Sequence, residues 1–108
     1  MTIKEISVSE LANFVQQGVR VVDVRETDEY QSGHLPGAIH VALSTIPEHL
    51  SEFQFDEPVY VVCRSGGRSM RACEFLHDAG ITNVVNVAGG TMGWITSGND
   101  VVMGDQPG

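Results

Sequence analysis

The sequence is poor in basic residues and lacks any long apolar segment. Its 108 residues include 6 Lys and Arg against 14 Asp and Glu, which gives a formal net charge of −8. Binding to nucleic acids or to anionic membranes requires basic side chains clustered over a broad surface, so we expect no nucleic-acid or membrane partner. Charge is present from Lys4 and Glu5 onward, and no apolar run of signal-peptide or membrane length follows. We therefore expect a cytoplasmic protein.

Metal-binding patterns are also missing from the sequence. The chain has 2 cysteines and 4 histidines, and their positions show none of the ligand spacings that are typical of zinc sites. We therefore expect no metal site. The positions considered are Cys63, Cys73, His34, His40, His49 and His77.

The length and composition suit one globular domain. A hydrophobic content of 42% is ordinary for a protein with a single buried core, and the sequence has no internal repeats or low-complexity segments. We predict one domain over residues 1–108, with its core at about residues 3–97 and a C-terminal tail at residues 98–108. This polar, glycine-rich tail is expected to be either loose or a docking strand around Val101 and Val102.

Strand and helix signals alternate along the chain. The capping box Ser7-Val8-Ser9-Glu10 predicts the start of a helix that stops at Gly18, and Ser44 is predicted to cap a helix with Pro47 in its first turn. This alternation predicts an α/β fold with a parallel sheet covered by helices on both faces. The predicted strands are residues 5–6, 19–24, 38–41, 59–62 and 84–87, and the predicted helices are residues 7–18, 26–32, 44–53, 69–79 and 90–96.

The most informative segment is residues 63–69, which read Cys-Arg-Ser-Gly-Gly-Arg-Ser and follow the apolar run at residues 59–62. Ligands of open parallel sheets bind beyond the carboxyl ends of the strands, and Cys63 is predicted to lie at such an end. The two adjacent glycines allow the loop to turn its N–H groups toward the sulfur. Amides and the flanking charges of Arg64 and Arg68 favour the thiolate, so we predict that Cys63 is a nucleophile.

A buried structural role is the alternative for Cys63, because free cysteines are among the most buried residues. Three of the 6 basic residues, Arg64, Arg68 and Arg71, lie within eight positions of it, which favours the anion-binding loop. Cys73 is predicted to be a structural core residue of the following helix. A disulfide between the two cysteines would block the nucleophile and is disfavoured in a reducing compartment.

Four segments resemble the rhodanese (sulfurtransferase) family, and they stand in the family's order. The resemblance covers about residues 3–97. It implies a single-domain, rhodanese-like protein with a central five-stranded parallel sheet of order 1-5-4-2-3, and a sulfurtransferase that works through a persulfide without a cofactor. The segments are Val22-Asp23-Val24-Arg25-Glu26 with Glu29-Tyr30, the run from Gly33 to His40, the loop at residues 63–69, and Val87-Ala88-Gly89-Gly90 with Gly93-Trp94.

The resemblance implies roles for individual residues. Cys63, Arg64 and Arg68 are predicted to be catalytic: Cys63 takes sulfur from a donor such as thiosulfate and passes it to cyanide or a thiol in a ping-pong mechanism. Asp23, Arg25 and His34 are predicted to support the loop, with Arg25 paired to Glu29 or to another acid. The residues predicted to bind substrate are Arg64, Ser65, Gly66, Gly67, Arg68 and Ser69.

Other functions share this pattern and stay open at this point. Phosphatases that look like rhodanese have a loop longer by one residue, and the shorter spacing between Cys63 and Arg68 suits bonded sulfur better than phosphate. A phosphatase or arsenate reductase is therefore disfavoured. A regulatory interaction module is a further alternative, although the presence of Cys63 argues against an inactive one. The sequence does not separate a free enzyme from a sulfur relay to an acceptor protein.

Overall fold

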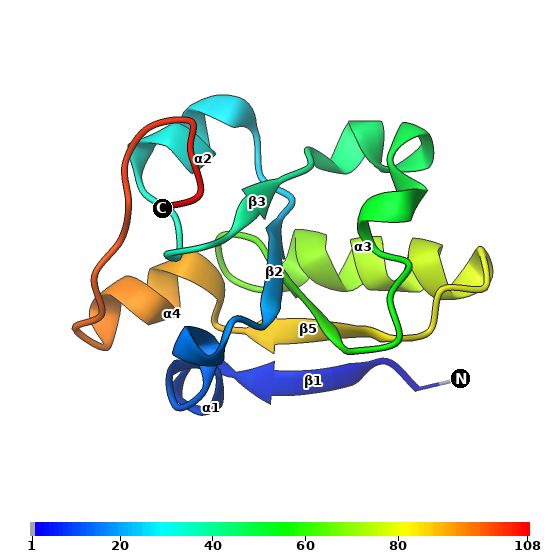
Figure 1. The fold of residues 1–108 in the computed structure, drawn as a ribbon, viewed down its shortest axis with the longest axis horizontal. Coiled ribbons are helices and arrows are strands. Elements are labelled where there is room, and N and C mark those ends of the chain that lie inside the picture. The colour runs from blue at the N-terminus through cyan, green and yellow to red at the C-terminus, as the bar shows by residue number, and fades with distance from the viewer. Residues whose placement is uncertain (1) are drawn as a thin grey trace.

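The computed structural model describes residues 2–108, and its central element is a sheet of five strands (Figure 1). The order across the sheet is β1-β5-β4-β2-β3, and all neighbouring strands are parallel. The predicted fold class and strand order are therefore confirmed. The strands are β1 (Lys4–Ser7), β2 (Arg20–Asp23), β3 (Ile39–His40), β4 (Val59–Val62) and β5 (Val84–Ala88).

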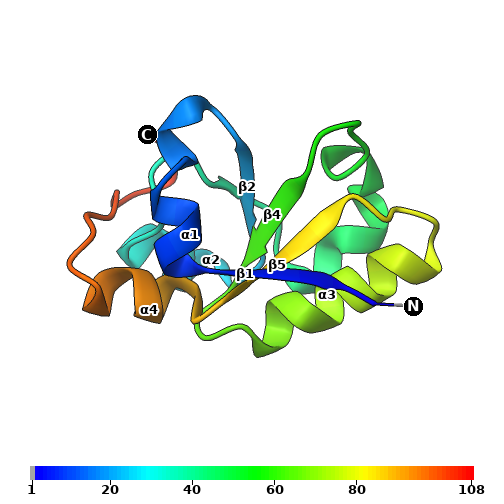
Figure 2. The ribbon, with the colours of Figure 1, turned by 90° about the horizontal axis from the view of Figure 1, so that it is seen from below.

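Helices cover both faces of the sheet (Figure 2). One face carries α3 (Gly67–Asp78) and two 3-10 helices, η2 (Leu43–Glu48) and η3 (Leu50–Glu52), whereas the other carries α1 (Val8–Ala12), α2 (Thr27–Ser32) and α4 (Gly90–Thr96). The neighbouring β2 residues Val21 and Val22 belong to different cores, as expected for a strand that is buried on both faces. Within residues 2–108, none of the helices has the length and apolar character needed to span a membrane.

The first predicted helix is shorter than expected. Its capping box is present, because the Ser7 hydroxyl accepts a hydrogen bond from the Glu10 N–H (3.1 Å) and the Glu10 carboxylate accepts one from the Ser7 N–H (3.2 Å). The helix nevertheless breaks before a 3-10 helix, η1 (Val15–Gln17). Phe14 has φ −137° and ψ 4°, and its ring packs against Tyr60 with 5.4 Å between centroids. Packing onto the sheet therefore overrides the local helix preference.

The prediction of one α-helix over residues 44–53 was wrong, because this segment forms η2 and η3. Pro47 lies inside η2 and has no N–H with which to make an α-helical hydrogen bond. The cap position is Ala42 and not Ser44. His49 separates the two helices with φ −132°, which lies outside the helical region.

Residues 98–108 lie against α2 and the loop that follows it (Figure 1). Val102 and His34 exchange two backbone hydrogen bonds, with N···O distances of 2.8 and 2.9 Å. Near the chain end, the Gly37 N–H donates to the carbonyl of Pro107 at 2.8 Å. The pairing of His34 with Val102 is an isolated antiparallel bridge outside the sheet. The tail is therefore docked on its own chain and is not loose.

Candidate active site

Cys63 directly follows β4, at the carboxyl end of the sheet, and is 1% exposed. The loop turns back over the sulfur at Gly66, whose φ of 114° is a left-handed conformation that glycine adopts without strain. The Gly66 N–H donates to the Cys63 Sγ at 3.1 Å, and the Ser69 hydroxyl lies 3.4 Å from the same sulfur. The sulfur is therefore enclosed by hydrogen-bond donors.

These surroundings make the Cys63 thiol more acidic. Burial raises its pKa, but hydrogen bonds from the Ser69 hydroxyl and from the N–H groups of Ser69, Gly66 and Ser65 lower it by more, so the pKa lies below the ordinary thiol value. The sequence predicted this direction from amides and arginine charges together. In the structure the hydrogen bonds of the loop are the main causes of the lowered pKa.

Arg68 is turned toward α2 and pairs with Glu29. Its two terminal nitrogens are 2.8 and 2.9 Å from the two carboxylate oxygens of Glu29, which is a bidentate geometry. The hydrogen bond from Arg68 is the main cause that lowers the pKa of Glu29 to about 2. The ion pair is therefore present at neutral pH and is lost only in acid, as the pH falls from the ordinary carboxyl value toward 2.

The other loop residues predicted to bind substrate lie nearer the surface. Arg64, Ser65 and Gly67 are exposed, and Gly66 is partly exposed. Among residues 2–108, the Arg64 side chain has no hydrogen-bond or ion-pair partner. Its guanidinium is thus free for an anion from solvent, in contrast to that of Arg68.

A buried ion pair lies at the carboxyl end of β2. Asp23 and Arg25 are 0% and 5% exposed, and the Arg25 Nη2 lies 2.7 Å from the Asp23 Oδ2. The same nitrogen donates to the carbonyl of Gly33 at 2.8 Å. Arg25 therefore pairs with Asp23 and not with Glu29. The pair connects β2 to the end of α2, which carries the partner of Arg68.

His34 connects α2 to the C-terminal tail. The residue is completely buried, and its ring stacks on Tyr30 with 3.7 Å between centroids. Its ring nitrogens lie 2.8 Å from the carbonyl oxygen of Tyr30 and 2.9 Å from that of Gln106. These contacts are those of a structural residue, and they join α2 to the tail; the role of His34 in supporting the cysteine loop stays a prediction.

The start of α4 packs against the backbone of the cysteine loop. The Thr91 N–H donates to the Cys63 carbonyl at 2.8 Å, and the Met92 N–H donates to the Arg64 carbonyl at 2.9 Å. Gly90 has φ 58°, and a Cβ at this position would lie 2.6 Å from the Cys63 oxygen and from the Arg64 carbonyl atoms. Glycine is therefore required for this close approach, which fixes two peptide groups at the start of the loop.

We expect the substitution Gly90→Ala to destabilise the protein by roughly 2–4 kcal/mol, because it adds a backbone clash to a left-handed conformation. Urea denaturation measures the effect. The matched control is Gly93→Ala in the same helix, where a Cβ would meet a Val8 methyl at an ordinary 3.5 Å. Equal free energies of unfolding in the two variants would contradict this role of Gly90.

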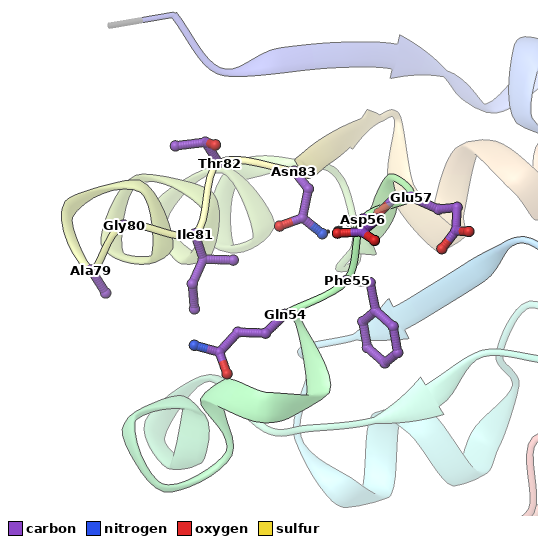
Figure 3. A pocket seen from close by; sticks show the side chains of 9 residues that line it. All are labelled: Gln54, Phe55, Asp56, Glu57, Ala79, Gly80, Ile81, Thr82 and Asn83. Carbon is purple, nitrogen blue, oxygen red and sulfur yellow. Dashed lines mark hydrogen bonds between the residues drawn. The ribbon is translucent and has the colours of Figure 1, made fainter.

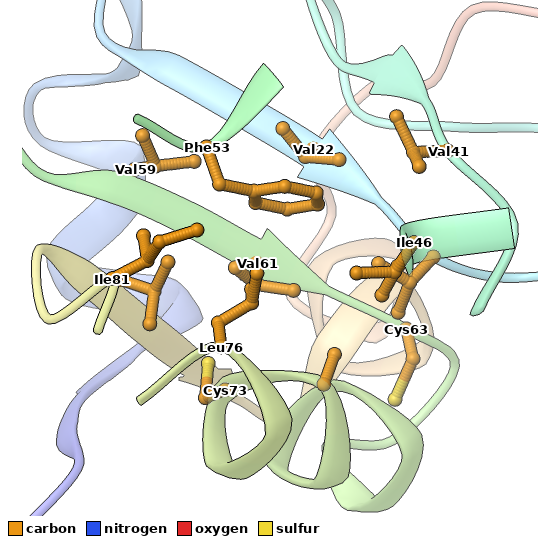
Figure 4. Packing of buried hydrophobic residues seen from close by; sticks show 13 residues of the cluster. Val22, Val41, Ile46, Phe53, Val59, Val61, Cys63, Cys73, Leu76 and Ile81 are labelled. Atoms are coloured by element: carbon orange, nitrogen blue, oxygen red, sulfur yellow. The ribbon is translucent and has the colours of Figure 1, made fainter. Parts of the chain in front are cut away.

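Cys73 lies in the core on the inner side of α3. It is 0% exposed and packs in the same cluster as Leu76 and Cys63 (Figure 4). Burial is the main cause that raises the pKa of its thiol to about 12, so it is almost entirely protonated at neutral pH. Both cysteines are free thiols. These properties suit the structural role predicted for Cys73.

A cavity of about 760 Å³ lies away from Cys63, at the amino ends of β4 and β5 (Figure 3). It is lined by residues 54–57 and 79–83, which include Asp56 and Glu57 but no cysteine, histidine or arginine. Within residues 2–108, no group of three or more His, Cys, Asp or Glu side chains is placed to hold a metal ion. The cavity has none of the nucleophilic or cationic groups found around Cys63.

Two residues of the site were missed by the sequence reasoning. Glu29 belongs to one of the quoted motifs, but its ion pair with Arg68 was not predicted. Asn86 was not considered, although a polar residue inside the apolar run Val84-Val85-Asn86-Val87 is a signal of a specific hydrogen-bonded role. Its amide oxygen lies 2.5 Å from the Ser69 hydroxyl oxygen.

A parallel sheet of order β1-β5-β4-β2-β3 with a cysteine loop after β4 defines a rhodanese-like protein. A family model described as Rhodanese-like domain matches residues 7–97. The chain belongs to this family.

Relatives agree in sequence and in structure. The chain is 38% identical over 96 residues to "Putative sulfurtransferase YtwF" of Bacillus subtilis, with 87% of this chain and 92% of that protein covered. It is 30% identical over 95 residues to "Thiosulfate sulfurtransferase GlpE" of Pseudoalteromonas translucida, covering 87% and 90%. The crystal structure of a rhodanese-like domain protein from Staphylococcus aureus matches with a TM-score of 0.83 and 36% identity, covering 94% and 98%. The names of the two sequence relatives support sulfur transfer as the general chemistry.

Proposed function

We propose that this protein is a sulfurtransferase that carries sulfane sulfur as a persulfide on Cys63. The observation that carries the proposal is the environment of this sulfur, which accepts a hydrogen bond from the Gly66 N–H, has the Ser69 hydroxyl 3.4 Å away and has a pKa that the loop lowers. A thiolate held in this way is a nucleophile at neutral pH without a separate general base.

The proposed reaction has two displacement steps. The Cys63 thiolate attacks the outer sulfur of thiosulfate, a sulfur–sulfur bond forms at Cys63, and the bond to the inner sulfur breaks with its electron pair leaving on sulfite. Cyanide then attacks the terminal sulfur of the persulfide, which forms thiocyanate and regenerates the thiolate. A thiolate of a small molecule or of a partner protein serves as acceptor in the same way. Charge is conserved in both steps, and no other oxidant or reductant is needed.

Two arginines have different parts in this proposal. Arg64 is exposed, and its side chain has no hydrogen-bond or ion-pair partner in the part of the chain that the structure describes, so its guanidinium is available to bind the sulfonate oxygens of the donor. Arg68 is held beside the loop by Glu29 and supplies positive charge where sulfite departs. The N–H groups of the loop stabilise the negative charge of the persulfide.

Thiosulfate as donor is supported by the relative named as a thiosulfate sulfurtransferase. The loop also favours sulfur over phosphate, because Arg68 follows Cys63 by five positions, one fewer than in the phosphatases that look like rhodanese. A smaller ring of donors leaves less room for a tetrahedral phosphate in line with the sulfur.

Mass spectrometry after incubation with thiosulfate tests the proposal. We expect the protein to gain one sulfur atom on the tryptic peptide that contains Cys63, and cyanide to remove it with formation of thiocyanate. Trypsin cleavage after Arg64, Arg68 and Arg71 separates the two cysteines. The control variant Cys73→Ser is expected to gain sulfur to the same extent. A protein that gains no sulfur, or gains it on Cys73, would refute the proposal.

A further inference from the structure

The Ser69 hydroxyl faces three groups that compete for one hydrogen. Ser69 is 0% exposed. Its Oγ lies 3.4 Å from the Cys63 Sγ, 3.3 Å from the carbonyl oxygen of Gly66 and 2.5 Å from the Oδ1 of Asn86. A hydroxyl has a single proton to donate. Two oxygens 2.5 Å apart need a hydrogen between them, and the amide oxygen of Asn86 carries none, so the Ser69 proton lies on the Asn86 side in this structure.

The orientation of the Asn86 amide follows from its other neighbours. Its Nδ2 lies 2.7 Å from the Oε2 of Glu5 and 3.3 Å from the carbonyl oxygen of Gly66. Both neighbours are acceptors without a hydrogen, so the NH₂ group must face them and the Oδ1 must face Ser69. The sheet register fixes this arrangement, because Glu5 of β1 is paired with Asn86 of β5.

We propose that Asn86, oriented by Glu5, is a positioning residue that draws the Ser69 hydroxyl proton away from the Cys63 sulfur and so limits the stabilisation of the free thiolate. The proposal rests on the proposed function of Cys63 as the sulfur carrier. Asn86 is 1% exposed, and its oxygen would be left buried without a donor if the hydroxyl turned to the sulfur. The amide does not relay a proton; it only orients the hydroxyl.

This competition changes during the catalytic cycle. In the thiol, the S–H donates to the Ser69 oxygen while the hydroxyl donates to Asn86, and all groups are satisfied. In the thiolate, the hydroxyl has two alternatives. It either donates to the sulfur and loses its hydrogen bond to Asn86, or it keeps that bond and the sulfur is stabilised by the backbone amides without it. In the persulfide the negative charge has moved to the outer sulfur, so the Sγ no longer needs the hydroxyl. Asn86 therefore favours the loaded state over the free thiolate, and it keeps the thiolate more basic and more nucleophilic.

Apart from Glu5, the charged and titratable groups near Cys63 make no hydrogen bond to the Asn86 side chain within residues 2–108. Arg68 comes from the same loop and is paired with Glu29 of α2, Asp23 of β2 is paired with Arg25, and the thiol of Cys73 approaches from α3. The hydrogen bonds of the Asn86 side chain involve Ser69, Glu5 and the Gly66 carbonyl instead. A substitution of Asn86 thus changes the hydroxyl without removing any of these charges.

The pH dependence of Cys63 alkylation by iodoacetamide tests this proposal on the full chain. We expect Asn86→Leu, which keeps the size of the side chain but removes its oxygen, to lower the titration midpoint by roughly 0.5–1 pH unit, a three- to tenfold rise in thiolate fraction below the midpoint. The maximal rate at high pH should fall, because the thiolate becomes less nucleophilic.

The variant Ser69→Ala provides the matched background. With the hydroxyl removed, adding Asn86→Leu should change the midpoint by less than about 0.2 pH unit. Where Asn86→Leu fails to fold, Asn86→Ala is measured with the same expected direction. An unchanged or raised midpoint in the single variants, or a full shift in the Ser69→Ala background, would overturn the proposal. Alkylation needs no sulfur donor, so this result is separate from the test of sulfur transfer.

Discussion

The substitution Cys63→Ser is expected to reduce sulfur transfer by at least about a thousandfold. A serine hydroxyl is far less acidic than a thiol and does not form a stable bond to sulfane sulfur, so the first displacement step is lost. The oxygen fits the same space and retains the N–H donor of Gly66, which lies 3.1 Å from the native sulfur. The variant should therefore fold, and thiocyanate formation from thiosulfate and cyanide measures its loss of activity.

The control for this prediction is Cys73→Ala. Cys73 is buried in the core, and its thiol has a pKa of about 12, so we expect the rate of sulfur transfer to stay within about twofold while the free energy of unfolding falls by about 1 kcal/mol. If Cys63→Ser kept the native rate and Cys73→Ala were inactive, the reaction would take place on Cys73, which would contradict the proposal.

The substitution Arg68→Ala is expected to lower kcat/KM for thiosulfate by roughly a hundredfold. In the proposed mechanism, the guanidinium supplies the charge that balances an anionic donor and the departing sulfite. Its removal also leaves the Glu29 carboxylate unpaired beside the loop, because the two groups form a bidentate pair at 2.8 and 2.9 Å. The unpaired carboxylate repels the donor, so removing Arg68 has two unfavourable consequences.

Two further variants separate these consequences. Adding Glu29→Gln to Arg68→Ala removes the repulsion and should restore part of the lost kcat/KM. Arg71→Ala makes the same change in net charge at an exposed position of α3 outside the loop, and it should leave kcat/KM within about twofold. Equal kcat/KM values for Arg68→Ala and Arg71→Ala would remove Arg68 from the mechanism.

The position of Cys63 was predictable because it follows from local signals. A short apolar run marks β4, two glycines mark the turn, and a helix follows, so the residue had to lie at a strand end. Asn86 and Glu29 were not predictable in this way. The hydrogen bonds of Asn86 with Glu5 and of Arg68 with Glu29 join residues 81 and 39 positions apart. Such pairs depend on which strands and helices become neighbours, and local patterns carry little of that information.

The same limit applies to the helices that were predicted incorrectly. The capping box at Ser7 was correct because all its groups lie within one turn. Phe14, in contrast, leaves the helix to reach Tyr60 of β4, a contact set by tertiary packing. The 3-10 helices around Pro47 contain a local signal, the missing N–H of proline, that was given too little weight.

The strand order has a consequence for how the protein folds. Within the described residues, β1 is an edge strand whose only neighbour is β5, and Lys4 is aligned with Val85. Closing this part of the sheet therefore requires a loop of about eighty residues. During synthesis on the ribosome, the first strand emerges long before its partner exists. High contact order of this kind slows folding. Asn86 thus gains the carboxylate that orients it only after β5 has been synthesised and has paired with the much earlier β1.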